Sequence, residues 1–183
     1  MKLTTLNAKF TLLSGIVVLI IAGAALEGRH SLTVMVSQAD EAQVAGQLLT
    51  NHMDSDMMHD AMRADVLKAT LGVAQNDPAV IEEAKKAAEE HGARFTKNFD
   101  ANQKLEKPDV LTQDFEKVAP ALKDYKEQAL ALIDKAAADV KAGTATAKAA
   151  TPKFKESFSA LEELMGKVTE DISAYSESVK NSQ

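Results

Sequence analysis

The chain has 183 residues, a formal net charge of −6, no Cys, 4 Pro and only 4% aromatic residues. The absence of Cys excludes a disulfide scaffold, a thiol nucleophile, a Cys-ligated zinc site and covalent c-type haem attachment. The acidic charge argues against a nucleic-acid-binding protein, which needs a basic face. A hydrophobic content of 45% with few aromatic residues favours long helices over a β-sandwich.

A segment without charged residues, Phe10–Leu26, lies near the N-terminus. As a helix it would be about 26 Å long, close to the roughly 30 Å hydrocarbon core of a bilayer. Lys2 and Lys9 precede it, so the positive-inside rule predicts a cytoplasmic N-terminus. The small residues Ala22-Gly23-Ala24 also fit the cleavage site of a signal peptide, and both alternatives export the rest of the chain.

The charge balance indicates where the exported part resides. We divide the chain into a cytoplasmic tip and transmembrane anchor, residues 1–26, and an exported domain, residues 27–183. Removing Lys2 and Lys9 from the 21 basic residues leaves 19 against 27 acidic residues, a net charge of −8. An acidic, Cys-free, exported domain suits a bacterial periplasm. We therefore predict a bacterial inner-membrane protein with a single N-terminal span and a periplasmic domain.

Three breaks divide the chain into four segments of helical periodicity. They lie at Gln75–Pro78, at Leu105–Asp109 and at Ala142–Pro152. The first segment has no Pro before the first break, which predicts one helix from about Leu6 to Ala74. At about 1.5 Å per residue this helix is on the order of 100 Å long.

The residues at these breaks predict how the helices begin and end. Asp77 is expected to cap the second helix, with Pro78 as its first residue. Gly143 is expected to stop the third helix and Thr151 to cap the fourth. Pro120 predicts either a kink in the third segment or a helix that begins only after it.

Apolar residues in the third and fourth segments repeat in alternating steps of four and three, the packing pattern of helix bundles. The two sets are Leu111, Phe115, Val118, Leu122, Tyr125, Ala129, Leu132 and Ala136, and Phe154, Phe158, Leu161, Met165, Val168, Ile172, Tyr175 and Val179. The second segment places Ile81, Ala84, Ala88, His91 and Phe95 on one face, with Gly92 as a weak point. We predict an all-α antiparallel up-down-up-down four-helix bundle, preceded by a transmembrane helix that is continuous with the first bundle helix.

The opening anchor, the segment His59–Leu67, the stretch Ala121–Tyr125 and the heptads of the fourth helix carry a resemblance to a known family. The arrangement resembles the periplasmic four-helix-bundle ligand-binding domain of bacterial methyl-accepting chemotaxis proteins. The resemblance covers nearly the whole chain, to about Ser178. It rests on architecture, which the sensor domains of histidine kinases share.

The resemblance implies a chemoreceptor sensory domain rather than an enzyme. It implies a homodimer through the first and fourth helices, with a small molecule bound between the first helices of two subunits and near the fourth helix. A small slide of the fourth helix would then carry the signal across the inner membrane. The fourth helix returns to the membrane, where a second span could begin beyond Gln183.

The densest group of functional side chains lies on one seam of the first helix. After Leu48 the seam continues with His52, Ser55, His59, Met62 and Val66. Because buried polar groups cost free energy unless they find partners, a ligand or a neighbouring helix is expected to supply those partners.

One interpretation of this seam is an anion site. Arg63 lies one turn beyond His59, and with His52 and Asp56 it could bind an anionic small molecule such as a carboxylate. Members of the resembled family use first-helix arginines for amino-acid carboxylates, and Arg63 is the residue here that matches. The chain has one such arginine rather than a group of them.

A second interpretation is a divalent metal held by His52, Asp56 and His59, with further ligands from a second chain. Haem is a weaker variant, since the fourth segment has no His. A phosphotransfer role for His59 is disfavoured, because His59-Asp60-Ala61-Met62-Arg63 does not fit a His-x-x-Lys-Gly context. We expect no resident cofactor.

The remaining interpretation is structural. His52 and His59 would bond across a helix interface while Met57, Met58 and Met62 fill irregular gaps. His91 is expected to pack in an interface, and His30 to lie at the lipid headgroups. No Gly-rich phosphate loop and no serine elbow points to catalysis.

Overall fold

The computed structural model describes the backbone of residues 6–181 and the side chains of residues 10–181. The elements are α1 (Leu6–Gln75), α2 (Pro78–Lys104), α3 (Asp109–Ala142), a short 3-10 helix η1 (Thr146–Ala150) and α4 (Thr151–Asn181). No strand occurs in residues 6–181, so the prediction of an all-α protein is confirmed. The prediction of one first helix through residue 74 is also confirmed.

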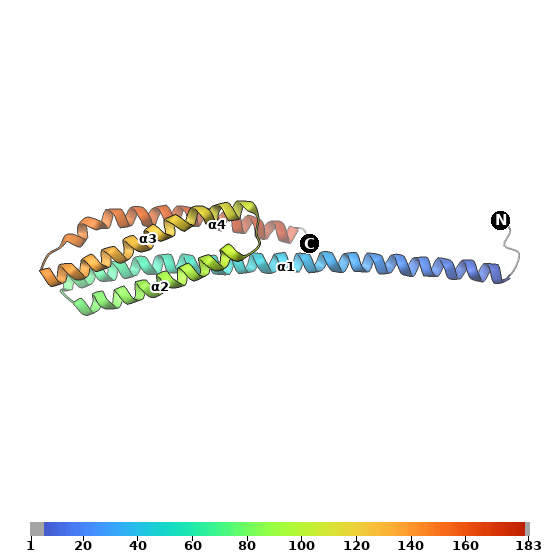
Figure 1. Ribbon diagram of the computed structural model, residues 1–183, viewed down its shortest axis with the longest axis horizontal. Coiled ribbons are helices and arrows are strands. Elements are labelled where there is room, and N and C mark those ends of the chain that lie inside the picture. The colour runs from blue at the N-terminus through green and yellow to red at the C-terminus, as the bar shows by residue number, and fades with distance from the viewer. Residues whose placement is uncertain (1–5, 182–183) are drawn as a thin grey trace.

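Three helices lie beside the C-terminal half of α1, while its N-terminal half projects alone (Figure 1). The core is shared by all four helices and contains, among others, Leu48, Phe95, Tyr125 and Phe158. The two predicted seams of α3 and α4 are buried, with Tyr175 half-buried. Burial of these rows supplies the main free energy that holds the helices together.

The chain turns are fixed by the residues that the sequence marks. The carboxylate of Asp77 accepts hydrogen bonds from the amides of Ala79, at 2.9 Å, and Val80, at 3.3 Å, and Pro78 follows it. Gly143 ends α3 in the left-handed region, at φ 65°, where a side chain would add strain. The predictions for Asp77, Pro78 and Gly143 are therefore confirmed.

The prediction for Thr151 is wrong, and one of the two alternatives predicted for Pro120 is excluded. Thr151 does not cap α4 from outside, because its own backbone is helical and it is the first residue of α4. α3 begins at Asp109 and contains Pro120 in its interior, which excludes a helix that begins only after this proline. Pro108, which precedes Asp109, already provides the start of the helix.

The connection from α3 to α4 is organised by Asp139, a buried residue that the sequence did not single out. Its carboxylate accepts hydrogen bonds from the hydroxyls of Thr144, at 2.6 Å, and Thr146, at 2.7 Å, and from the amide of Ala147, at 2.5 Å. The bond from Thr144, together with those from Ala147 and Thr146, holds the pKa of Asp139 well below its usual range, although burial opposes this. The ionised side chain thereby orders η1.

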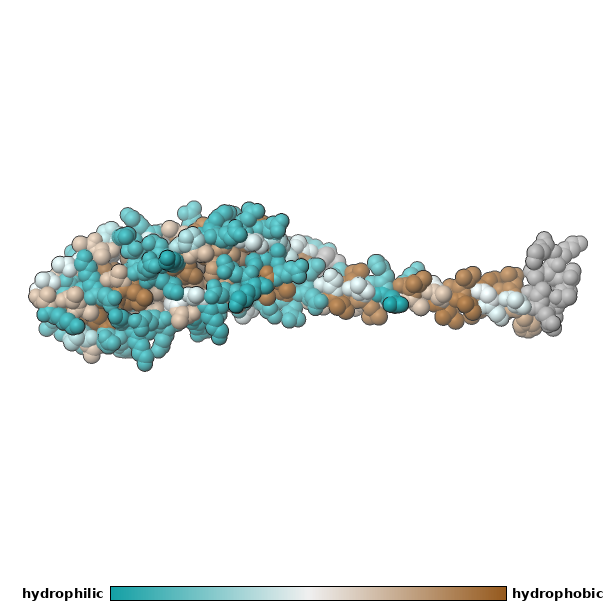
Figure 2. Space-filling view, viewed as in Figure 1, coloured by the Kyte–Doolittle hydropathy of each residue, from teal (hydrophilic) through white to brown (hydrophobic). Residues whose placement is uncertain are grey.

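The projecting part of α1 is apolar and unburied. The described residues contain one helix with a stretch that is long and apolar enough to cross a membrane, and none of that stretch is buried. Figure 2 shows hydrophobic surface along the projecting part and mainly hydrophilic surface on the packed helices. Lys2 and the side chain of Lys9, which carry the predicted orientation, lie outside the described residues.

The first turn depends on a close approach at Gly72. A Cβ atom at this position would lie 2.6 Å from Cγ1 of Ile81 and 3.1 Å from the carbonyl oxygen of Asp77. We expect Gly72→Ala to destabilise the protein by about 1–3 kcal/mol, because the second helix must move away. Thermal unfolding of the full chain in detergent, followed by circular dichroism, measures this change.

Gly166→Ala is the matched control. Gly166 also lies inside a helix, but its Cβ would meet nothing within 4 Å. Alanine there should stabilise the protein by about 0.5–1 kcal/mol through helix propensity. Equal effects at the two positions would contradict the assignment of close packing to Gly72.

Candidate functional site

The first polar residue of the seam, His52, is bonded to the fourth helix. Its Nε2 atom lies 3.1 Å from the carbonyl oxygen of Met165 and 2.8 Å from Oγ1 of Thr169. Burial lowers the pKa of His52, opposed by the charge of Asp56 and by the bond to Met165. His52 is therefore a neutral group that joins α1 to α4, with its Nε2 already engaged.

His59 lies among three aromatic rings. Its imidazole stacks on Phe158 with ring centroids 4.2 Å apart and an interplanar angle of 10°, and it meets Tyr125 edge-on at 4.8 Å. Phe95 completes the cluster at 6.5 Å. The hydroxyl of Tyr125 donates a hydrogen bond of 2.7 Å to the backbone oxygen of His59, whereas the Nε2 atom of His59 is buried without a partner. His59 is therefore a core residue of α1.

Arg63 lies on the exposed side of the same ring. The Cζ atom of its guanidinium is 4.6 Å from the centroid of Phe158, a cation–π contact. Arg63 also lines a cavity of about 500 Å³ that α1 and α4 form together with Leu132 of α3. Phe158 thus separates two sites: His59 in the core and Arg63 at the cavity.

The cavity combines an apolar wall with positive charge. Its apolar side chains are Val66, Leu67, Leu132, Phe154 and Phe158, and its polar ones are Arg63, Thr70, Thr151, Lys155, Ser159 and Glu162. Two cations, one carboxylate and three hydroxyls give it a net charge of +1 in a strongly acidic protein. A small anion with an apolar body suits such a lining.

The structure brings only one of the four sequence candidates to this cavity. Arg63 lines it, His59 lies behind Phe158, and His52 is bonded to α4. Asp56 is exposed and affects both histidines only through its charge. Met57, expected to fill a gap, is 64% exposed, whereas Met58 and Met62 are buried as expected.

The metal interpretation lacks a ligand set among the described residues. Within residues 10–181, no group of three or more His, Asp and Glu side chains lies close enough together to hold a metal ion. The Nε2 atom of His52 is occupied by its bonds to α4, and Asp56 points into solvent. His52, Asp56 and His59 therefore do not converge on one point.

Polar pairs fix the opposite side of α1 to α2. The Nδ1 atom of His91 lies 2.7 Å from Oδ2 of Asp65, so His91 sits in a helix interface as predicted. The guanidinium of Arg94 forms two hydrogen bonds with the carboxylate of Asp54, one of them 2.8 Å long. These pairs position the face of α1 that carries His52 and His59 towards α3 and α4.

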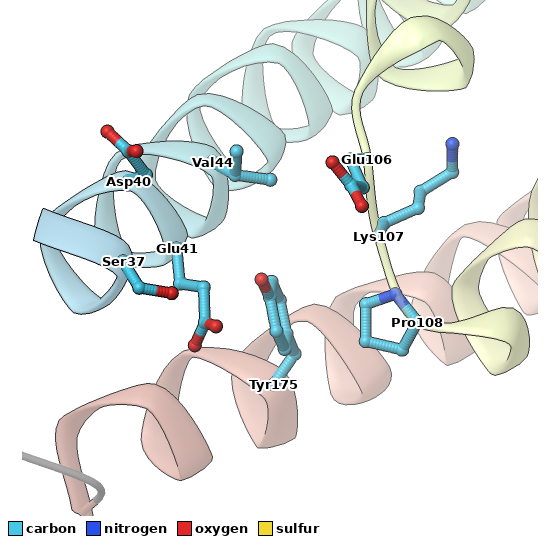
Figure 3. A pocket seen from close by; sticks show the side chains of 8 residues that line it. All are labelled: Ser37, Asp40, Glu41, Val44, Glu106, Lys107, Pro108 and Tyr175. Carbon is cyan, nitrogen blue, oxygen red and sulfur yellow. The ribbon is translucent and has the colours of Figure 1, made fainter. Parts of the chain in front are cut away.

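A second cavity of about 500 Å³ lies near the point where α1 leaves the other helices. Figure 3 shows the Tyr175 ring and the Glu41 carboxylate approaching one another at its wall, with Lys107 extending away from them. Burial raises the pKa of Tyr175, and the charges of Glu41 and Glu106 add to the effect. With three carboxylates against one lysine, this cavity does not suit an anion.

The sequence did not identify Lys155, Ser159 and Glu162 as companions of Arg63. The apolar heptad of the fourth helix places these residues beside Phe154 and Phe158. To recognise them as neighbours of Arg63, the register of α4 against α1 was needed as well.

Comparison with protein-family models, with curated proteins and with solved structures finds no match. The assignment of a function therefore depends on the site and on the sequence pattern alone.

The hydroxyl of Tyr125 provides a test of the aromatic cluster. Tyr125→Phe removes its hydrogen bond to the backbone of His59, and we expect a loss of about 0.5–1.5 kcal/mol in the free energy of unfolding. Tyr175→Phe is the control, because this hydroxyl faces a cavity (Figure 3). A change of less than about 0.5 kcal/mol is expected there. Urea unfolding of both full-length variants measures the difference, and equal losses would refute the role of the Tyr125 bond.

Proposed function

We propose that this protein is a membrane-anchored sensory domain of the chemoreceptor type, which binds a small anion in the bacterial periplasm. The observation that carries the proposal is the pairing of Arg63 and Lys155 on an apolar cavity between α1 and α4. α1 and α4 are the two helices that approach the membrane in this arrangement. A ligand between them would act directly on the elements that transmit a signal.

The proposed architecture is an antiparallel up-down-up-down four-helix bundle. Contacts between α1 and α4 support it, because they move backwards along α4 as they move forwards along α1. His52 bonds to Met165 and Thr169, whereas His59, further along, stacks on Phe158. The short turns after Gln75 and Lys104 support alternating directions for the other helices.

The proposed anchor is residues 10–26 of α1, with the bundle on the periplasmic side. The exposed apolar surface of this segment supports insertion into lipid, since so large a hydrophobic area is unfavourable in water. The lysines before the segment support a cytoplasmic N-terminus. A slide of α4 relative to α1 is then the proposed signal.

The proposed partner is a second copy of the chain, docked along an outward row of α1. Met53, Met57, Leu67 and Leu71 are each more than half exposed, and their spacing places them on one face of the helix. Ala64 continues the row, which Asp60 interrupts. Burial of this row against its copy would place two anion cavities in one homodimer.

A carboxylate with an apolar body should bind the cavity. We expect benzoate to raise the Tm of the full chain in detergent, whereas neutral benzyl alcohol should not, because the guanidinium of Arg63 requires an anionic partner. At a concentration 100 times its Kd, a ligand stabilises the folded state by about 2.7 kcal/mol. Acetate and succinate, tested alongside, separate the contribution of the apolar body from that of the charge.

Substitutions locate this binding. Arg63→Ala and Lys155→Ala should each reduce the rise in Tm, whereas Lys153→Ala should not, since Lys153 is exposed outside the cavity lining. No rise with any of these carboxylates, or a rise that persists in Arg63→Ala, would refute the anion site.

The absence of Cys allows a direct test of topology. A single cysteine introduced as Lys180→Cys, at the exposed end of α4, should react with a membrane-impermeant maleimide added to spheroplasts. Thr4→Cys should react only after lysis, because the N-terminus is proposed to be cytoplasmic. The reverse pattern would overturn the orientation. Loss of an N-terminal tag together with a soluble product would show a cleaved signal peptide instead of an anchor.

A further inference from the structure

Four helices meet at one ionisable side chain. His59 of α1 is 2% exposed, and its ring contacts Phe95 of α2, Tyr125 of α3 and Phe158 of α4. A change in the charge of this imidazole therefore acts on every packed helix at once.

The packing around His59 accommodates the neutral ring and not the charged one. The buried Nε2 atom has no hydrogen-bond partner. In neutral imidazole one nitrogen carries no proton, but in the imidazolium both nitrogens are donors that need acceptors. A buried cation without an acceptor is far more costly than a buried lone pair. Proton uptake at His59 therefore requires the surroundings to rearrange.

The carboxylates whose charges act on His59 differ in the helix that carries them. Burial is the largest influence on the pKa of His59 and lowers it, and the charges of Asp60, Asp56 and Glu162 oppose this, as does a backbone hydrogen bond with Phe158. Asp56 and Asp60 lie on α1 with His59, so an ion pair with either leaves the helices in place. Glu162 lies on α4, and an ion pair with it would bring α1 and α4 together.

The other side chains around His59 do not supply an acceptor. Arg63 of α1 is a cation over the same Phe158 ring. The hydroxyl of Tyr125 on α3 already donates a hydrogen bond to the backbone oxygen of His59. α2 contributes the uncharged Phe95 at this level, while its neighbours His91 and Arg94 are paired with Asp65 and Asp54.

We propose that His59 is a proton-binding site of the sensory domain, and that proton uptake there opens the aromatic cluster and pairs the imidazolium with Glu162 of α4. The domain then responds to acid as well as to an anion, and the movement again involves α1 and α4. The proposal does not need the anion, because the proton-binding residue His59 lies behind Phe158, away from the cavity lining, although its proposed partner Glu162 lines the cavity.

The direction of the pH effect follows from linkage. In the unfolded chain a histidine binds its proton near pH 6.5, whereas folded His59 binds it at lower pH. Between these two pH values the unfolded state holds more protons, so the stability of the neutral packing falls as the pH falls through this window. Above the window the neutral packing is unaffected.

The two tyrosines of the chain make a simple probe. We would label the full chain with ring-13C tyrosine, place it in lipid nanodiscs and follow the NMR signals of Tyr125 and Tyr175 between about pH 8 and 4.5, the range in which histidines titrate. The Tyr125 signal should shift with a midpoint below 6.5. The shift should be lost in His59→Gln and retained in His91→Gln.

Glu162→Gln tests the pairing on a residue that is exposed and outside the aromatic cluster. We expect it to lower the midpoint of the Tyr125 shift, because the imidazolium loses its acceptor, whereas Glu163→Gln should leave the midpoint unchanged. A Tyr125 signal that does not respond to pH, or responds equally in His59→Gln, would overturn the proposal. An unchanged midpoint in Glu162→Gln would overturn the pairing with α4. No ligand is used, so failure of this test and failure of the anion site are distinguishable.

Discussion

The contact between the seam of α1 and the aromatic rings of α3 and α4 is the interaction on which the packing depends. α1 places histidines where the other helices place apolar or aromatic residues, and each histidine requires a specific neighbour. His52 finds a carbonyl oxygen on α4, and His59 finds three rings and a tyrosine hydroxyl directed at its backbone. Polar groups in a core limit the arrangements that satisfy them, so the seam also selects the register of the helices.

That register determines where a ligand could bind. His59 stacks on the ring of Phe158, and the guanidinium of Arg63 lies over the same ring at the protein surface. Lys155, one turn earlier than Phe158 on α4, lines the cavity that Arg63 also lines. The Asp54–Arg94 and Asp65–His91 pairs hold α2 to another part of α1, which leaves the cavity open. The fold thus places a hydrophobic wall and two cations together on an otherwise acidic protein.

Local signals in the sequence were sufficient for the helices and for most of their boundaries, with Thr151 and Pro120 as the exceptions. Asp77 before Pro78, Gly143 at the end of α3 and the apolar spacing of α3 and α4 each act over a few residues, so they can be recognised without a structure. The role of Asp139 could not be recognised, since its partners are hydroxyls and an amide in a connection without a periodic pattern. Asp56 shares the helical spacing of the polar seam but faces solvent, because spacing alone does not distinguish neighbouring positions on a helix surface. Lys155 required the relative position of two helices that are distant in sequence.

The unbroken length of α1 has a mechanical consequence. No proline and no break in the helix separates the segment proposed to lie in lipid from the segment that carries the seam, so both would tilt as one lever. From Gly28 to Gln75 this lever is about 70 Å long, and a change of about 5° in tilt moves its far end by about 6 Å. Helices adjust their tilt to the thickness of the surrounding bilayer. The turn at Gly72 and Asp77 would therefore be displaced as the membrane thickens or thins. Bilayer composition would in this way affect the position of the whole bundle.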